Sequence, residues 1–445
     1  MRVLGIGESC ELGALYWRLA RAGHDVRVFI QDPAMRDVHA GLVRQTTDWR
    51  AELGWLRGSG AGDGPDDALV LFECASHGAW QDELRAAGFQ VIGGSGWGDR
   101  VESDRAFGQQ VLRQAATHTF DSHAAASAFL AQNPGRYVLK LNGAEALRTR
   151  NYVGQLDDGR DLAALLHAQQ QVPCSRAAGP GDTSFVLMAH VQGIEVGVGA
   201  YFNGHDFLRP ALLDWEHKHF FAGEQGELTG EMGTIVSYRG AATLFERTLG
   251  RLLQPLREAR HCGWVNLNLI VNAQGIWPLE FTSRFGYPGY AICGALHRES
   301  WDRLFLRMLR RDALDFVTHD GFACGVVLSV PPFPYTFGYD ALSKGLPLCA
   351  RDTADTGALL ADENLHFCEV RRSGAQLLAS GASGYIGVAT GIGAQVADAQ
   401  RAAYAAAHRV VVPNLRYRHD IGDRVAADLA QLTAWGHVTP EPSAA

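Results

Sequence analysis

Lysine is nearly absent from this sequence. The chain has 40 basic residues, of which only Lys140, Lys218 and Lys344 are lysines, so the other 37 are arginines. A chain that avoids lysine so consistently gives little reason to expect one by chance inside an apolar segment. Lys140 lies in such a segment, Tyr137–Leu141, where a lone charge needs a partner. Lys140 is therefore a candidate functional residue.

The cysteines include no Cys-x-x-Cys pair and no clustered Cys/His spacing. This pattern excludes a disulfide scaffold and argues against a zinc site. We predict reduced, buried thiols that pack as small apolar side chains. The eight positions are Cys10, Cys74, Cys174, Cys262, Cys293, Cys324, Cys349 and Cys368.

Long apolar runs and an excess of positive charge are also lacking. No run reaches the roughly 18 residues that a membrane span needs. Glu8 and Glu11 interrupt the apolar stretch that a signal peptide would require. The net charge is −8, so no overall field favours nucleic acid or an anionic membrane. We expect a cytoplasmic protein that binds neither of them.

The sequence does have the composition of a compact enzyme. It is 47% hydrophobic and 20% charged over 445 residues, which at roughly 150 residues per domain corresponds to about two to four domains. Residues 1–100 alternate between apolar strand patterns and helical periodicity, which predicts a parallel sheet with helices on its faces. The predicted strands are 2–7, 26–30, 68–72 and 89–92, with helices near 11–21 and 80–87.

The strongest local signal lies in residues 263–290, where two strands, 264–271 and 276–281, joined by Asn-Ala-Gln-Gly predict a hairpin. Asn266 and Asn268 share one face of the first strand, and Glu280 and Thr282 share one face of the second. Facing oxygen-bearing strands suit Mg²⁺, which takes hard oxygen ligands and shares them with nucleotide phosphates. The alternative is a polar, exposed strand face.

Arg284 lies just beyond this hairpin, where it could neutralise a transferring phosphoryl group or bind a carboxylate in bidentate fashion. Lys140 either extends from a strand end to solvent or contacts phosphate. Like Lys140, Glu195 is a charged residue inside an otherwise apolar predicted strand. The spacing of Glu216–His219 favours a solvated loop over a metal or phosphate patch.

The first glycine turn, Gly5–Gly13, follows a strand and opens a helix. A helix N-terminus can bind phosphate. Glu8 and Glu11 would repel one, and the turn contains no cation. The turn is either a plain sheet-to-helix connection or a loop that faces a ligand.

Taken in order, several motifs resemble those of the ATP-grasp ligases, in particular glycinamide ribonucleotide synthetase, also called phosphoribosylamine–glycine ligase. The similarity covers nearly the whole chain. It rests on Ile92–Ser95 with Glu102–Phe107, Val138–Gly143, Gly193–Glu195, Glu216–Lys218, Thr229–Gly233, Leu279–Gly286 and Tyr417–Gly422.

The resemblance implies an ATP-grasp fold of the α/β class, with a parallel N-terminal domain, a hinged lid and an α+β C-terminal domain. The implied domains are 1–100, 101–315 with a lid at about 118–192, and 316–438, followed by a frayed tail at 439–445. It implies ATP and Mg²⁺ or Mn²⁺ as cofactors, small carboxylate and amine substrates, and a monomer or homodimer.

The family motifs also assign roles to residues. They imply catalytic roles for Arg284 and Lys218, and metal binding by Glu280, Asn268 and Thr282. ATP binding falls to Arg105, Lys140, Arg148, Met188, His190 and Glu195, and substrate binding to Met232, Gly233 and Arg418. Glu8 and Glu11 are candidate substrate residues on other grounds, because the charge of their turn suits an uncharged or cationic amine.

The departures from the family fall on the substrate side, in the lid loop and at the metal site. Glu8–Leu12 stands where the family has Gly-Gly-Arg-Glu-His, and Ala144–Arg150 replaces a glycine-rich lid loop. Thr282 replaces an asparagine at the metal site. We therefore expect an amide-forming ligase that uses an acyl phosphate and acts on another amine or acid, such as an amine other than phosphoribosylamine. The alternatives are a true glycinamide ribonucleotide synthetase and a nucleotide-binding protein without catalysis.

Overall fold

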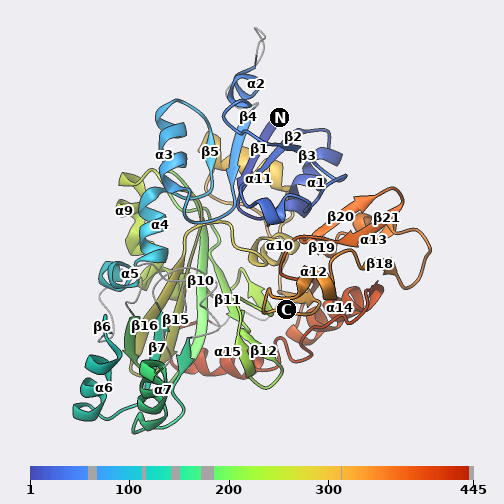
Figure 1. The fold of residues 1–445 in the computed structure, drawn as a ribbon. Coiled ribbons are helices and arrows are strands. Elements are labelled where there is room, and N and C mark those ends of the chain that lie inside the picture. The colour runs from blue at the N-terminus through green and yellow to red at the C-terminus, as the bar shows by residue number, and fades with distance from the viewer. Residues whose placement is uncertain (59–67, 113–116, 142–150, 172–184, 312, 440–445) are drawn as a thin grey trace.

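The computed structural model describes residues 1–58, 68–112, 117–141, 151–171, 185–311 and 313–439 (Figure 1). The N-terminal part forms a sheet of order β3-β2-β1-β4-β5 in which every neighbouring pair is parallel, as predicted. Its strands are β1 (Arg2–Gly7), β2 (Asp25–Ile30), β3 (Arg44–Thr46), β4 (Ala68–Phe72) and β5 (Val91–Ile92). The helices here are α1 (Gly13–Arg21), η1 (Pro33–Met35), α2 (Leu53–Arg57) and α3 (Gly78–Ala86).

The carboxyl ends of β1 and β4 lie side by side in this sheet. Both strands are buried along most of their length because helices cover the two faces of a parallel sheet. The residues that follow them, 8–12 and 73–77, therefore share one edge, where ligands of open α/β sheets commonly bind.

A larger sheet of order β16-β15-β10-β11-β14-β17-β22-β19 forms the centre of the molecule, and its neighbouring strands run antiparallel. The predicted hairpin is its β15–β16 edge. The strands are β10 (Ile194–Asn203), β11 (Leu212–Glu216), β14 (Gly233–Ser237), β15 (Cys262–Asn272), β16 (Gly275–Thr282), β17 (Phe322–Ser329), β19 (Leu365–Phe367) and β22 (Tyr385–Gly393). The helices between them are α8 (Ala242–Arg247), η4 (Leu249–Leu252), α9 (Leu253–Glu258), α10 (Gly289–Ala295) and α11 (Trp301–Arg310).

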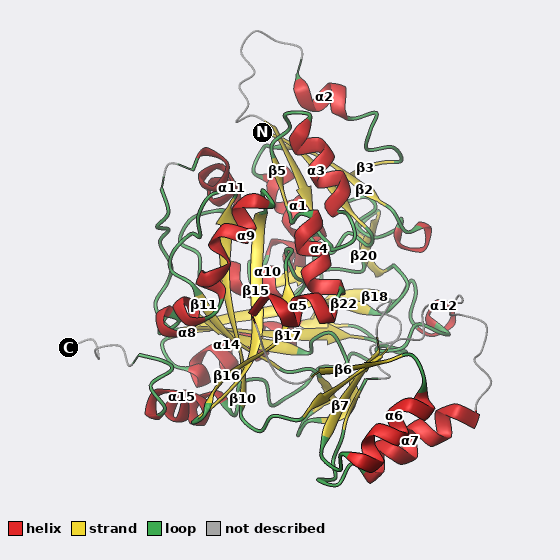
Figure 2. Cartoon of the chain, turned by 90° about the vertical axis from the view of Figure 1, so that its left-hand side faces the viewer, coloured by secondary structure: helices red, strands yellow, loops and turns green. Residues whose placement is uncertain are grey.

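A small sheet of order β6-β9-β7-β8 projects from this body, with α6 and α7 on its outer side (Figure 2). It has an apolar core of its own, which includes Leu130, Leu139, Leu166 and Phe185. Two helices, α4 (Gly96–Ser103) and α5 (Arg105–Leu112), precede it. Its elements are β6 (Thr117–Phe120), α6 (His123–Gln132), β7 (Tyr137–Leu141), β8 (Tyr152–Val153), α7 (Arg160–Gln171) and β9 (Phe185–Ala189).

The C-terminal third adds a sheet of order β20-β21-β18-β23 and lays α14 (Val396–Arg409) against β17 and β22. Its strands are β18 (Pro347–Ala350), β20 (Val370–Ser373), β21 (Gln376–Ala379) and β23 (Val410–Val411). Its other helices are α12 (Tyr339–Leu342), α13 (Gly357–Ala361) and α15 (Val425–Ala434). A short ribbon, β12 (His219–Phe221) with β13 (Gln225–Leu228), lies between this region and the central sheet.

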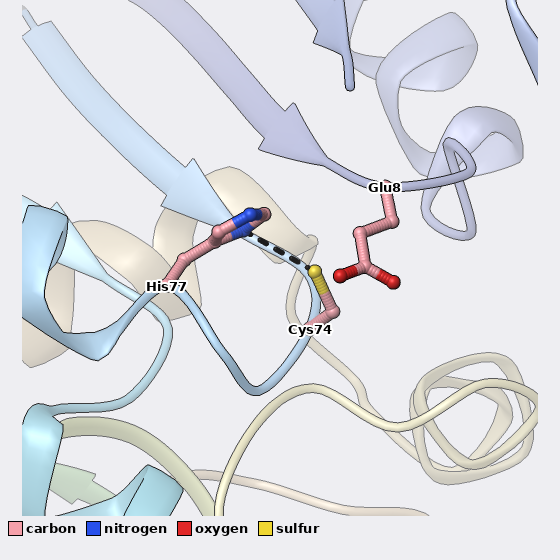
Figure 3. A group of neighbouring side chains, drawn as sticks. All are labelled: Glu8, Cys74 and His77. Carbon is pink, nitrogen blue, oxygen red and sulfur yellow. Dashed lines mark hydrogen bonds between the residues drawn. The ribbon is translucent and has the colours of Figure 1, made fainter. Parts of the chain in front are cut away.

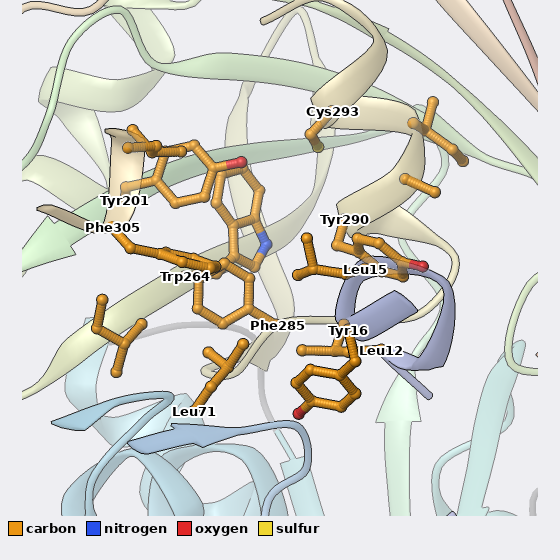
Figure 4. Close-up of a cluster of buried hydrophobic side chains, with 14 of the residues drawn as sticks. Leu12, Leu15, Tyr16, Leu71, Tyr201, Trp264, Phe285, Tyr290, Cys293 and Phe305 are labelled. Carbon is orange, nitrogen blue, oxygen red and sulfur yellow. The ribbon is translucent and has the colours of Figure 1, made fainter. Parts of the chain in front are cut away.

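One apolar core joins the N-terminal sheet to the central body (Figure 4). Tyr16 and Leu71 come from the N-terminal part, and Tyr201, Trp264 and Phe285 come from the central part. All five side chains are buried. The edge formed by residues 8–12 and 73–77 is thus fixed relative to the β15–β16 hairpin.

The prediction of uniformly buried cysteines is only partly correct. Cys349 is exposed and Cys74 is half-buried, and Cys174 lies outside the described residues. The other cysteines in the described ranges are buried free thiols. No helix in those ranges has the length and apolar character required to span a membrane.

Candidate functional site

A cavity of about 360 Å³ lies between the small sheet and the β15–β16 edge of the central sheet. Lys140, Met188 and His190 line it from the small sheet, and Glu195, Lys218, Glu280, Thr282 and Arg284 line it from the central body. The protein therefore brings most of the predicted ATP, metal and catalytic residues to one place.

Lys218 is the centre of the charged network in this cavity. Its Nζ lies 2.8 Å from Glu195 Oε1, 2.9 Å from Glu280 Oε1 and 3.3 Å from Glu216 Oε2. The expectation that Glu216–His219 forms a solvated loop is wrong. Glu216 ends β11 inside the sheet, and the buried His217 accepts a hydrogen bond from the Gly422 N–H at its Nε2.

The surrounding carboxylates set the protonation of the network. Burial alone would lower the pKa of Lys218, but Glu195, Glu280 and Glu216 hold it well above its ordinary value. Burial would raise the pKa of Glu195, yet Lys218 lowers it overall. Lys218 and Glu195 therefore form a charged pair at neutral pH.

Further carboxyl groups carry raised pKa values. Burial, with the negative charges of Glu195 and Glu280, raises the pKa of Glu216 despite Lys218. Burial and Glu216 raise the pKa values of Asp214 and Glu231 well above the usual range. A cation entering the cavity would relieve this repulsion.

Lys140 connects the small sheet to the central sheet. It lies on β7, which pairs with β9, and its Nζ is 3.4 Å from Glu280 Oε2. Met188 and His190, from β9 and the turn after it, line the same side of the cavity. Lys140 therefore points into the cavity instead of out to solvent.

The predicted metal ligands are cross-strand neighbours. Asn268 pairs with Glu280 and Asn266 pairs with Thr282 in the β15–β16 register. Asn268 donates to Glu216 Oε2 at 2.9 Å, and its own oxygen accepts a hydrogen bond from the Asn266 amide nitrogen at 3.3 Å. The Asn266 amide oxygen is buried and has no hydrogen-bond partner among the described residues. Oxygen-bearing side chains with an unsatisfied amide oxygen, that of Asn266, beside them fit a Mg²⁺ ion.

Arg284 links this cavity to the edge of the N-terminal sheet. Its Nε donates to Glu102 Oε1 at 3.1 Å, and its terminal nitrogen lies 4.0 Å from Glu11 Oε2. The turn itself contains no cation, as the sequence shows, but Arg284 reaches Glu11 from a distant part of the chain. Glu8 on the same turn accepts a hydrogen bond from the Ser76 hydroxyl.

The remaining predicted substrate residues do not line the cavity. Met232 is fully buried in the apolar core, and a side chain at Gly233 would collide with the Gly325 carbonyl. Arg418 is buried, with its guanidinium bound by Asp420, Glu224 and the His219 carbonyl. Because those groups already occupy it, we leave Arg418 out of the proposed site. Arg148 and the Arg105 side chain lie outside what the structure describes.

Sequence reasoning missed Asp214, Glu231 and Glu102 as members of the site. Asp214 and Glu216 are two residues apart on β11 and share one face, a signal that the apolar residues around them obscured. Glu102 sits near the end of α4, and no local pattern connects it to Arg284.

Comparison with known proteins places this arrangement in a wider context. A family model of the ATP-grasp (A) domain of phosphoribosylglycinamide synthetase matches residues 104–290. The phosphoribosylamine–glycine ligase of Neisseria meningitidis is 24% identical over 452 residues, covering 95% of this chain and 99% of its own. That of Streptococcus suis is 25% identical over 381 residues, covering 81% of this chain and 83% of its own.

Solved structures show the same fold. The phosphoribosylamine–glycine ligase of Thermotoga maritima superposes with a TM-score of 0.69 at 19% identity, covering 95% of this chain and all of that one. A biotin carboxylase from Campylobacter jejuni superposes with a TM-score of 0.58 at 12% identity, covering 93% of this chain and 92% of its own.

Proposed function

We propose that this chain, an ATP-grasp enzyme similar to phosphoribosylamine–glycine ligases, joins a carboxylate to an amine with cleavage of ATP. The observation that carries the proposal is the convergence of Lys140, Lys218 and Arg284 with Glu280 in one cavity. Three cationic side chains beside a set of oxygen ligands suit a nucleoside triphosphate with its bound Mg²⁺.

In the proposed reaction a carboxylate oxygen of the acid attacks the γ-phosphorus of ATP, and ADP leaves. The amine nitrogen then attacks the carbonyl carbon of the acyl phosphate, phosphate leaves, and the nitrogen loses a proton. The protein contributes positioning and neutralisation of charge in place of covalent chemistry. Lys140 and Lys218 would bind phosphate oxygens, and Arg284 would stabilise the transferring group.

Glu280, Asn268 and Thr282 would hold Mg²⁺ or Mn²⁺, which would neutralise phosphate charge. Thr282 offers a neutral hydroxyl in this set, so Glu280 supplies the negative charge among these three ligands. Glu195, held ionised by Lys218, keeps the lysine directed into the cavity.

We assign residues of about 118–192 as a lid over the nucleotide. The small sheet has a separate apolar core and contributes Lys140, Met188 and His190 to the cavity wall. Met188 and His190 would lie against the adenine.

The charge of the N-terminal edge supports an amine other than phosphoribosylamine. Glu8 and Glu11 lie on the turn after β1, and Arg284 is already engaged by Glu11 and Glu102. Bringing a phosphate dianion near either carboxylate of the turn is unfavourable by about 1–4 kcal/mol, which corresponds to an affinity loss of up to several hundredfold. An uncharged or cationic amine avoids this repulsion.

Measuring ADP release with ATP, glycine and phosphoribosylamine, and again without the phosphoribosylamine, tests the substrate assignment. We expect slow turnover with this amine because of the turn carboxylates. Efficient ligation would refute the altered-substrate proposal and identify a glycinamide ribonucleotide synthetase. Binding of ATP without turnover across a panel of acids and amines would instead indicate a protein that has lost catalysis.

Replacing Lys140 with alanine should weaken binding of Mg–ATP by roughly 1.5–3 kcal/mol, the value of a hydrogen bond to a charged group, or about ten- to 150-fold. Titration calorimetry measures this directly. Lys344→Ala is the matched control, because Lys344 pairs with Asp37 on another part of the surface. Equal affinities for Mg–ATP in the two variants would show that Lys140 has only a structural role.

A further inference from the structure

Three metal-ligating side chains meet at the edge of the N-terminal sheet, apart from the nucleotide cavity (Figure 3). Glu8 follows β1, and Cys74 and His77 follow β4. One donor atom from each residue lies within 4.8 Å of the other two. The Cys74 sulfur and His77 Nδ1 are 3.4 Å apart, close to the roughly 3.3–3.8 Å between two ligands of a tetrahedral zinc ion.

His77 is oriented by its other contacts. Its Nε2 bonds the Gln31 side-chain oxygen, so the proton lies on Nε2 and the Nδ1 lone pair faces Cys74. The ring stacks on Trp80 with centroids 4.6 Å apart and is 3% exposed. An outer partner that fixes the tautomer and the ring plane is the usual support of a histidine ligand.

The loop between Cys74 and His77 holds Glu8 beside these two side chains. Ser76, with a φ of 80°, has the left-handed backbone that non-glycine residues seldom adopt. Its hydroxyl donates to Glu8 Oε1 at 3.0 Å. The turn after β1 and the turn after β4 are thereby tied together.

We propose that Glu8, Cys74 and His77 bind a divalent transition-metal ion, with zinc as the best fit. Thiolate, imidazole and carboxylate are the ligands that zinc takes, whereas Mg²⁺ prefers an all-oxygen set such as the one at Glu280. One thiolate and one carboxylate balance the charge of the ion, and the thiol proton is released when the metal binds. With the ion bound, the repulsion of a phosphate dianion at this turn rests on Glu11 alone.

Three protein ligands leave a fourth position open. Structural zinc sites usually close all four positions with protein ligands, whereas sites that meet a substrate keep one for water or for a substrate atom. Glu8 is exposed and Cys74 is half-buried, so this position is accessible from solvent. Glu11, on the same turn as Glu8, lies 4.0 Å from Arg284 of the nucleotide cavity. The open position would take a water or a donor atom of a substrate at this edge.

The proposal departs from the sequence-based argument against a zinc site. The Cys-x-x-His spacing of Cys74 and His77 supplies two ligands, and the third comes from 66 positions earlier in the chain. No contiguous motif contains the set. The site also does not rest on the proposed ligase activity, since its test uses neither ATP nor substrate.

Titrating the metal-free protein with Co²⁺, without nucleotide, tests the site. We expect one equivalent to produce the near-ultraviolet absorption of a cobalt–thiolate bond, and Zn²⁺ to abolish the band by displacement. Cobalt bound only by oxygen ligands in the nucleotide cavity gives no such band. Cys74→Ser should remove it, and Cys349→Ser, at an exposed cysteine, should leave it intact.

Two further variants separate an effect on metal coordination from an effect on folding. Gln31→Leu keeps all three ligands and should weaken Co²⁺ binding by roughly 10–100-fold, as expected for loss of an outer partner. Glu8→Gln, at an exposed residue, should weaken it by at least about tenfold. Absence of the band in the wild-type protein, or its persistence in Cys74→Ser, would overturn the proposal.

Discussion

Replacing Glu280 with glutamine should lower Mg²⁺-dependent ATP cleavage by roughly 100-fold or more, the scale on which charge stabilisation at a phosphoryl group acts. Glu280 is the carboxylate of the β15–β16 donor set and lies beside Lys140 and Lys218. Glutamine keeps the size of the side chain but not its charge. Lys218 retains Glu195 and Glu216 as partners, so the fold should persist.

The measurement is ADP release as a function of Mg²⁺ concentration, with circular dichroism to verify folding. Glu83→Gln, which removes an exposed carboxylate from α3, is the matched control and should retain full activity. Wild-type turnover in Glu280→Gln would exclude Glu280 as the principal metal ligand.

Replacing Lys218 with methionine should destabilise the fold by about 3 kcal/mol at neutral pH, the lower end of the range for breaking a buried ion pair. The lower end applies because Lys218 keeps 21% of its side chain exposed. The variant leaves Glu195, Glu216 and Glu280 without their shared cation. Lys344→Met, which removes a more exposed lysine, should cost no more than about 1 kcal/mol.

The pH dependence of the free energy of unfolding shows why Lys218→Met destabilises the fold. Lys218 lowers the pKa of Glu195 below its ordinary value of 4.5, so the pair contributes stability above that pH and loses it as the carboxylate is protonated. The difference between wild type and Lys218→Met, measured by urea unfolding, should therefore shrink as the pH falls below 4.5. A difference independent of pH would mean that packing, and not charge, is lost.

The parts of the fold that follow from local sequence patterns were predictable. The parallel N-terminal sheet follows from alternating strand and helix patterns, and the β15–β16 hairpin follows from its turn residues and the two-residue spacing of Asn266, Asn268, Glu280 and Thr282. These signals are local, since strand periodicity and turn chemistry depend on a few neighbouring residues.

Contacts between distant segments were not predictable in this way. Glu216–His219 is charged, which favours solvent when taken alone, but three carboxylates from separate strands surround Lys218 and offset its burial. Arg284 meets Glu11 across 273 positions of the chain. Such pairings depend on strand order, which no window of sequence contains.

The apolar core shared by Tyr16, Leu71, Tyr201, Trp264 and Phe285 bears on how proteins of this kind can be recombined. Cutting the chain after the N-terminal sheet would leave large aromatic surfaces of the central body facing water. The first hundred residues are thus a poor unit for exchange between enzymes. A preference for a different amine substrate is more readily obtained by changing side chains in the turns after β1 and β4, because such changes leave the backbone of the sheet in place.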